Sequence, residues 1–269
     1  MAIEANEEEH PQAPSAPNEK GVYSAIFNEG AESLERPSSA LFWSAFSAGL
    51  SMGFSMVAQA LLQVSLPDVE WRPLVVKLGY SIGFLIVVLG RQQLFTENTL
   101  MPVLPWLQQK TAKLFVSLLR VWAVVLLANI LGSFLFALVC NYTSVFEPET
   151  KQEFFALGTA ALQHSVVTTF GRAIFGGWLI ALMGWLLPFS GAARVFIIIL
   201  ITYLVGVGHF SHIIAGSSEA FIAAMHGAVS WSDALTKFFI PTLFGNTLGG
   251  VFLVAGLNHA QVKSGKSES

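Results

Sequence analysis

Residues 205–219 read V-G-V-G-H-F-S-H-I-I-A-G-S-S-E and break an apolar run that begins at Val195. If that run crosses a membrane, the glycines and serines of the break leave backbone groups unpaired where lipid offers no hydrogen bond. The break must then face protein or a water-filled cavity. Its two histidines, His209 and His212, are ionisable groups inside a span, and such groups mark a functional site by default. The alternative is that each is a buried structural histidine bonded to backbone carbonyl groups.

The composition around this break is that of an integral membrane protein. Hydrophobic residues make up 54% of the 269 residues and charged residues 12%, against about 25% charged residues in a soluble domain. With a formal net charge of −3 and scattered basic residues, the chain has no patch suited to nucleic acid. Its one cysteine, Cys140, excludes an intramolecular disulfide and a cysteine-based metal cluster, and no cofactor is expected.

Six apolar runs approach the length, about 20 residues, that a helix needs to cross a bilayer. They cover residues 41–62, 74–90, 114–139, 156–187, 195–208 and 238–257. The second run continues past a polar break at residues 91–98 into 99–107, and the fifth continues past its own break into 220–229. The sequence therefore predicts an all-α membrane protein with six transmembrane helices, of which the second and the fifth are broken.

The two breaks belong to an internal repeat. Asn129, in A-N-I-L-G-S, follows Thr96 of the first break at nearly the spacing at which Asn246, in G-N-T-L-G-G, follows His212 of the second. Because each half of the chain carries three spans, the halves are expected to cross the membrane in opposite directions. Inverted repeats of this kind bring their broken helices together near the midplane, where they form the substrate site.

Polar tails are expected to flank one channel domain. The N-terminal tail is expected at residues 1–37 and the C-terminal tail at residues 259–269. Between them, residues 38–258 form the six-span domain, with repeats at about 38–140 and 155–258. Acidic, proline-containing residues 1–19 favour disorder. Residues 22–34 suit either a short amphipathic helix on the membrane face or a solvated linker. Seven lysine and arginine residues lie in or near the short loops on the side of the two tails, and four lie on the opposite side. Because such residues gather on the cytoplasmic side, both termini are expected in the cytoplasm.

Four segments of the chain carry short sequence motifs that can be compared as a set with those of known families. They are K-L-G-Y-S-I-G-F from Lys77 continuing to G-R-Q-Q-L-F-T from Gly90, R-A-I-F-G-G-W from Arg172, the break around His212, and I-P-T-L-F-G-N-T-L-G-G from Ile240. Together they resemble the formate/nitrite transporter family and, within it, a diverged YfdC-like branch. The resemblance runs in order over about residues 22–257.

This resemblance implies an aquaporin-like protomer in a homo-pentamer with one pore per protomer, in the lipid bilayer of a bacterial inner membrane. It implies passage of a small monovalent anion or its conjugate weak acid. His212 would stand at the centre of the pore with Thr96 opposite, while Asn129 and Asn246 would fix the two breaks from behind. Five apolar residues would form constrictions that exclude hydrated ions: Tyr80, Phe84, Leu94, Ile180 and Val205.

The chain departs from the family motifs at several positions, four of them in the two breaks. Arg91 and His209 stand where the motifs have glycine, and Gln93 and Ser211 stand where they have an acid. Arg91 is expected to tune the pore, to plug it, or to pair with Glu97 or Glu219. These changes remove acids and add basic groups, which keeps a path for an anion.

An imidazole titrates near neutrality, so His212 is expected to lend a proton to the anion inside an apolar pore. Three other functions fit parts of the sequence. One is a pore for a neutral solute in which the histidines are structural, and another is a non-conducting protein blocked by Arg91. The third is a membrane enzyme in which His164, His209 and His212 bind zinc, since three histidines suffice for such a site.

Overall fold

The structure of the protein is a computed structural model that describes residues 18–264. The disorder expected for residues 1–19 and the end of the expected C-terminal tail fall largely outside this range. Every regular element within it is a helix. In chain order they are α1 Glu19–Glu35, α2 Ser38–Met52, α3 Phe54–Ser65, α4 Arg72–Val76, η1 Lys77–Tyr80, α5 Ser81–Leu89, α6 Phe95–Asn98, α7 Val103–Gln109, α8 Ala112–Tyr142, α9 Pro148–Leu162, α10 Val166–Leu186, η2 Gly191–Ala193, α11 Arg194–Val207, α12 Ala215–Met225, α13 Trp231–Asp233, η3 Ala234–Phe239, α14 Ile240–Leu248, η4 Gly249–Gly256 and α15 Leu257–Ser264.

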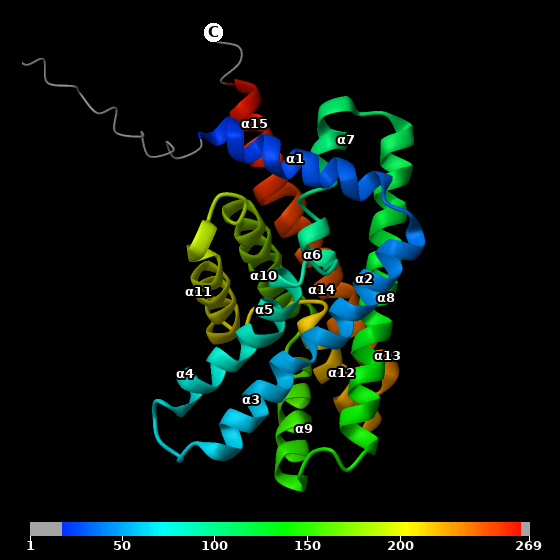
Figure 1. Ribbon diagram of the computed structural model, residues 1–269. Helices are drawn as coiled ribbons and strands as arrows, with labels where there is room; N and C mark the ends of the chain where they lie inside the picture. The colour runs from blue at the N-terminus through cyan, green and yellow to red at the C-terminus, as the bar shows by residue number, and fades with distance from the viewer. Residues whose placement is uncertain (1–17, 265–269) are drawn as a thin grey trace, which may run out of the picture.

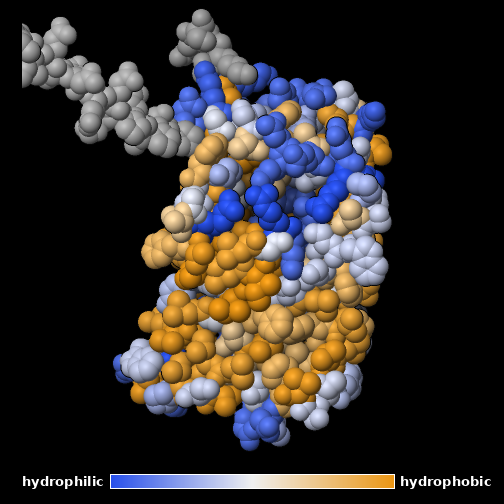
Figure 2. Space-filling model, viewed as in Figure 1, coloured by the Kyte–Doolittle hydropathy of each residue, from blue (hydrophilic) through white to orange (hydrophobic). Residues whose placement is uncertain are grey.

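The helices form an elongated bundle whose flank is apolar. Figure 2 shows a broad hydrophobic belt below a hydrophilic end, the pattern expected of a surface that meets lipid. Within the described residues, five continuous helical stretches are long and apolar enough to cross a membrane: Ser38–Ser65, Arg72–Leu89, Ala112–Tyr142, Val166–Leu186 and Trp231–Ser264. A shorter apolar stretch, Gly191–Val207, corresponds to the fifth expected span. It is short because its helix stops at the glycine that opens the second break.

The fourth expected span, residues 156–187, is not continuous. It is divided into α9 and α10, with residues 163–165 between them. Ser165 begins α10 as its N-cap, because its side chain accepts a hydrogen bond from the backbone N–H of Thr168 at 3.2 Å. The polar Gln163, His164 and Ser165 interrupt the run without a glycine or a proline, so the sequence shows only a weak sign of the division.

Glycines let two pairs of helices approach closely behind the breaks. A Cβ atom on Gly49 of α2 would lie 2.1 Å from the carbonyl oxygen of Asn129 in α8. A Cβ atom on Gly177 of α10 would lie 2.3 Å from the carbonyl oxygen of Asn246 in α14. Helix pairs in membranes use small residues to bring their backbones together in this way. The contacts place the side chain of each asparagine beside one of the two breaks.

The first helix, α1, lies across the end of the bundle that also carries α15 and α7 (Figure 1). Arg120 of α8 holds its last turn, because its guanidinium donates to the carbonyl oxygens of Leu34 at 2.7 Å and Arg36 at 2.9 Å. Near the other end, the Tyr23 hydroxyl bonds Nδ1 of His259 at 2.8 Å. Burial raises the pKa of the Tyr23 phenol, which keeps its proton at any physiological pH.

Replacing Arg120 with methionine should loosen the last turn of α1. The variant Arg120→Met loses the charged donor that satisfies the otherwise unpaired carbonyl groups at the helix end. We expect amide hydrogen exchange in residues 30–36 to speed about tenfold, since hydrogen bonds to charged groups contribute about 1.5 kcal/mol or more. The control is Lys113→Met, an exposed residue of the same helix. Equal exchange in the two variants would show that Arg120 does not hold α1.

Candidate functional site

The two breaks begin with the same backbone turn. Arg91 and His209 both adopt a left-handed conformation with φ of 50°. In the next residues, the N–H of Gln92 donates to the carbonyl oxygen of Val87 at 2.9 Å, and the N–H of Phe210 donates to that of Val205 at 3.0 Å. Left-handed backbone favours glycine because it crowds a Cβ atom. This explains why the resembled motifs have glycine at both positions.

Each break is then held by one buried asparagine. The Asn129 Oδ1 atom accepts from the N–H of Phe95 at 2.9 Å, and its amide group donates to the carbonyl oxygens of Ala45 and Gln93. Asn129 therefore ties the first break to α2 and α8. Buried backbone groups outside a helix need such partners, because leaving one unpaired costs about 1–3 kcal/mol.

Asn246 repeats the same three hydrogen bonds at the second break. Its Oδ1 atom accepts from the N–H of Ile213 at 2.8 Å, and its amide group donates to the carbonyl oxygens of Ala173 and Ser211 at 2.7 Å and 2.9 Å. Both asparagines are fully buried. Each amide group uses both of its N–H donors on backbone carbonyl oxygens, so the asparagines hold the two loops of the site in place.

These bonds set the register of the two breaks. Since Phe95 matches Ile213, His212 occupies the position of Leu94 rather than that of Thr96. The sequence spacing had aligned Thr96 with His212, and the hydrogen bonds shift that alignment by two residues. Thr96 and His212 meet from non-equivalent positions, so the site between the breaks is chemically asymmetric.

His212 and Thr96 form a direct contact in the interior of the protein. Nε2 of His212 lies 2.8 Å from Oγ1 of Thr96, and the two residues are 1% and 0% exposed. The backbone N–H of Ala215 donates to Nδ1 of His212 at 3.1 Å. Because Nδ1 accepts, the neutral imidazole carries its proton on Nε2 and donates it to the threonine hydroxyl. The hydroxyl keeps its own proton for another acceptor.

The five residues expected to form constrictions are buried in the same apolar cluster near this contact. Phe84 packs its ring against the His212 ring at 5.0 Å between centroids, and Tyr80 packs against Phe84 at 5.4 Å. Exposed fractions are 8% for Tyr80 and 0% for the other four: Phe84, Leu94, Ile180 and Val205. Apolar side chains therefore surround the polar contact, and they disfavour any unpaired charge beside it.

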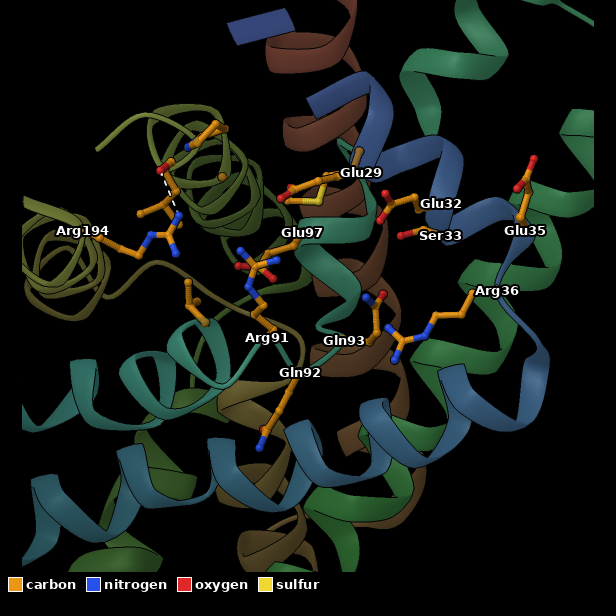
Figure 3. Close-up of a pocket in the computed structure, with 15 residues that line it drawn as sticks. Glu29, Glu32, Ser33, Glu35, Arg36, Arg91, Gln92, Gln93, Glu97 and Arg194 are labelled. Atoms are coloured by element: carbon orange, nitrogen blue, oxygen red, sulfur yellow. Dashed lines mark hydrogen bonds between the residues drawn. The ribbon is translucent and has the colours of Figure 1, made fainter. Parts of the chain in front are cut away.

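A cavity of about 530 Å³ lies on the side of the contact where α1 and α15 are found, and we call it the tail-side vestibule. Figure 3 shows its lining residues coming from α1 on one side and from the first break on the other. Arg91 and Gln93 line it together with Glu97 and Glu29. The Gln93 side chain accepts from Asn98 Nδ2 at 3.0 Å, which fixes its orientation.

A second cavity, of about 560 Å³, lies on the other side of the contact, and we call it the distal vestibule. His209 and His212 line it together with Glu219. Arg91 and Glu219 therefore face different vestibules, which removes the suggested pairing of these two residues. No ion pair joins Arg91 to Glu97 within residues 18–264 either. Arg91 is exposed and lines the tail-side vestibule, whereas the five residues expected to form constrictions belong to the buried apolar cluster.

The three histidines of the enzyme hypothesis do not form a metal site. His212 has both ring nitrogens engaged, by Thr96 and by the backbone of Ala215. His164 bonds the guanidinium of Arg172. Across the described part of the chain, no group of three or more histidine, cysteine or acidic residues has the geometry to hold a metal ion.

Two polar residues of the distal vestibule were missed by the sequence analysis. Lys77 donates to Oε1 of Gln59 at 2.8 Å, and Gln59 in turn donates to the carbonyl oxygen of Ser55 at 3.2 Å. Lys77 is the only basic residue inside the run 74–90, which is a usable sequence signal. Gln59 lies among small and apolar residues of its own run and gives no comparable signal.

Comparisons with known proteins agree with this architecture. The family profile described as formate/nitrite transporter matches residues 20–260. The chain is 43% identical over 246 residues to the inner membrane protein YfdC of Escherichia coli, covering 91% of this chain and 79% of that protein. It is 27% identical over 217 residues to the formate channel BtFdhC of Bacillus thuringiensis, covering 77% and 80% of the two chains.

The fold also matches that of solved channels. A pentameric formate channel with formate bound superposes with a TM-score of 0.74 at 22% identity, covering 84% of this chain and 97% of that one. A channel of the same family superposes with a TM-score of 0.76 at 20% identity, covering 90% and 99%. Members of this family are transporters and channels, which sets the enzyme hypothesis aside. The chain is thus an integral membrane protein that belongs to the formate/nitrite transporter family.

Proposed function

We propose that the protein is a channel for small monovalent anions or their conjugate weak acids, formate and nitrite being the first candidates. The observation that supports the proposal most directly is the buried hydrogen bond between Thr96 and His212, which lies among apolar side chains between two vestibules lined in part by charged residues. The names of a related formate channel and of a structural neighbour with bound formate support the same substrate class. A bare anion in this constriction would lose its hydration without an opposite charge, which disfavours its passage as an ion.

The proton transfer that we propose begins with uptake of a proton by His212. Its Nδ1 atom loses the hydrogen bond from the backbone N–H of Ala215 and binds the proton instead, so the ring becomes an imidazolium. The Thr96 hydroxyl then gives its proton to the anion while it receives the proton from Nε2. The substrate leaves as a neutral acid, and His212 is again neutral with its proton on Nδ1. Return of the proton to Nε2 restores the starting tautomer.

The same proposal includes the inverted repeats, the pentameric assembly and the side of the membrane on which the termini lie. We take the two halves, residues 38–140 and 155–258, to be inverted repeats with broken second and fifth helices and an aquaporin-like arrangement. The matching hydrogen bonds of Asn129 and Asn246 support this. The pentameric neighbour supports a pentamer with one pore per protomer. The excess of basic residues on the side of the tails supports cytoplasmic termini at residues 1–37 and 259–269.

The test is a comparison of solutes with the unmodified protein. Proteoliposomes are loaded in separate experiments with formate, nitrite, hydrosulfide, urea and glycerol, and the flux of each is compared with that of empty liposomes. The proposal expects flux of at least one of the three anions and none of the two neutral solutes. Flux of urea or glycerol would favour a neutral-solute pore. Absence of every flux would favour a non-conducting protein.

Replacing Arg91 with glycine should change how the tail-side vestibule collects the anion. The exposed cation contributes about 0.5–1 kcal/mol of attraction in water-filled space, so flux of Arg91→Gly at low formate should fall about threefold. Maximal flux should stay the same, because Arg91 does not fill the constriction. Lys110→Gly is the control, since Lys110 has the same left-handed backbone, with φ of 51°, outside the vestibules. A gain of flux in Arg91→Gly alone would show that Arg91 plugs the pore.

A further inference from the structure

Four basic side chains converge on the distal vestibule from separate parts of the chain. Lys77 comes from η1, His164 from the turn between α9 and α10, Arg172 from α10 and His209 from the second break. The charges of Lys77 and Arg172 both act on His209, so the groups are near one another. His212 lines the same cavity. Basic groups that crowd together in a cavity repel one another, and an anion placed among them removes that repulsion.

Arg172 is held in place without an acidic partner. Its Nη1 atom donates to Nε2 of His164. In residues 18–264 the ion pairs are Arg72 with Asp68 and Lys237 with Asp233, and neither involves Arg172. Since Nη1 is engaged, the opposite edge of the guanidinium, formed by Nε–H and Nη2–H, has two parallel donors. That edge matches the two oxygens of a carboxylate or a nitrite ion.

The other cation of the vestibule already has its charge offset. Lys77 donates to Gln59, which is 1% exposed. The Glu219 carboxylate attracts the charge of Lys77 and interacts with the side-chain amide of Gln59. Lys77, Gln59 and Glu219 thus form a group that is neutral overall. Glu153, the other acid that lines the vestibule, forms no ion pair in the described part of the chain. Arg172 is therefore the cation that remains for a ligand, and Glu153 opposes the binding of an anion.

We propose that Arg172, oriented by His164, forms a binding site for a small planar oxyanion with two oxygens on one edge, in the distal vestibule before the Thr96–His212 contact. Lys77 and His209 border this site and Glu153 lowers its affinity. The site rests on the proposed passage of such anions, and it adds a place where they wait outside the constriction. It is made by residues other than those of the central contact.

The test measures binding and flux separately. Binding of formate to the purified full-length protein in nanodiscs is followed by saturation-transfer NMR of the formate proton. In Arg172→Met the concentration for half-saturation should rise about tenfold or more, because two charge-assisted hydrogen bonds are lost. In Arg172→Lys it should rise less, since the charge stays and the paired donors are lost. In Glu153→Gln it should fall about threefold through loss of an opposing charge.

The control is Lys237→Met, which removes an exposed cation that lies outside the vestibule. Its half-saturation should equal that of the unmodified protein. If Arg172→Met and Glu153→Gln both leave half-saturation unchanged while formate still crosses proteoliposomes, this site is wrong and the proposed channel function stands. If formate binds with the expected dependence on Arg172 and Glu153 but none of formate, nitrite and hydrosulfide crosses, the site stands and the channel function is wrong. If no formate binds at all, the site is wrong.

Discussion

Replacing Asn246 with leucine should destabilise the protein more than any other single change at the second break. The variant Asn246→Leu leaves the N–H of Ile213 without its partner and removes the bonds to the carbonyl oxygens of Ala173 and Ser211. Each buried group left unpaired costs about 1–3 kcal/mol, so the free energy of unfolding should fall by about 3–6 kcal/mol. Denaturant unfolding in detergent, followed by tryptophan fluorescence, measures this change.

The matched control for that experiment is Asn258→Leu. Asn258 makes one side-chain bond, to the carbonyl oxygen of Val254 four residues earlier in the same continuous helical stretch, and it is partly exposed. Its loss should cost no more than about 1 kcal/mol, because the carbonyl group keeps access to other partners. If both leucine variants unfold with similar free energies, Asn246 does not hold the second break.

Replacing Gly177 with alanine should force two helices apart. Its new methyl group would lie 2.3 Å from the carbonyl oxygen of Asn246 and 2.4 Å from its Cα atom, and backbone atoms cannot move aside as a flexible side chain can. Overpacking of this kind costs about 1–3 kcal/mol, and the rigid contact places Gly177→Ala at the upper end. Because α14 carries Asn246, the shift should also disturb the second break and lower flux.

The control for Gly177→Ala is Gly171→Ala, which places an alanine on the same helix where no neighbouring helix is in contact. Nothing lies within 4 Å of a Cβ atom built there. Gly171→Ala should therefore stabilise the protein by about 0.5–1 kcal/mol through helix propensity alone. The two alanine variants are expected to shift the free energy of unfolding in opposite directions. Equal shifts would contradict the close packing of α10 against α14.

The features that sequence patterns predict well are those with a strong local cause. Lipid demands apolar residues of one length, so the long spans stand out as continuous apolar runs. Backbone at membrane depth must be paired, so glycines and polar residues at 91–98 and 205–219 revealed the two breaks. Asn129 and Asn246 stood out by their repeated spacing behind the breaks and by the resembled motifs, and each accepts a hydrogen bond from the backbone of its break.

The features that were missed depend on contacts between distant segments. The division of the fourth run at residues 163–165 has no glycine or proline to mark it. The two-residue shift between the breaks follows from which N–H each asparagine binds, and spacing along the chain does not determine that choice. Gln59 matters because Lys77 folds against it from another helix. None of these contacts leaves a periodic trace in the sequence.

At the candidate site, the sequence shows which residues are unusual, and the folded structure shows where their side chains lie. Arg91 and His209 stand at positions where the backbone favours glycine, and the sequence shows the change of residue directly. Which vestibule each one faces is a property of the folded chain. Arg91 belongs to the tail-side vestibule and His209 to the distal one. Substitutions at these two positions therefore address the two entrances separately.

The central claim is that the permeating anion takes a proton at His212. The most direct measurement is formate flux in proteoliposomes across about pH 5 to 8, with the unmodified protein and His212→Asn side by side. The account predicts flux that rises toward acid in the unmodified protein, and a loss of at least about tenfold together with loss of the pH dependence in His212→Asn. Flux in His212→Asn that keeps both the magnitude and the pH profile of the unmodified protein would contradict it.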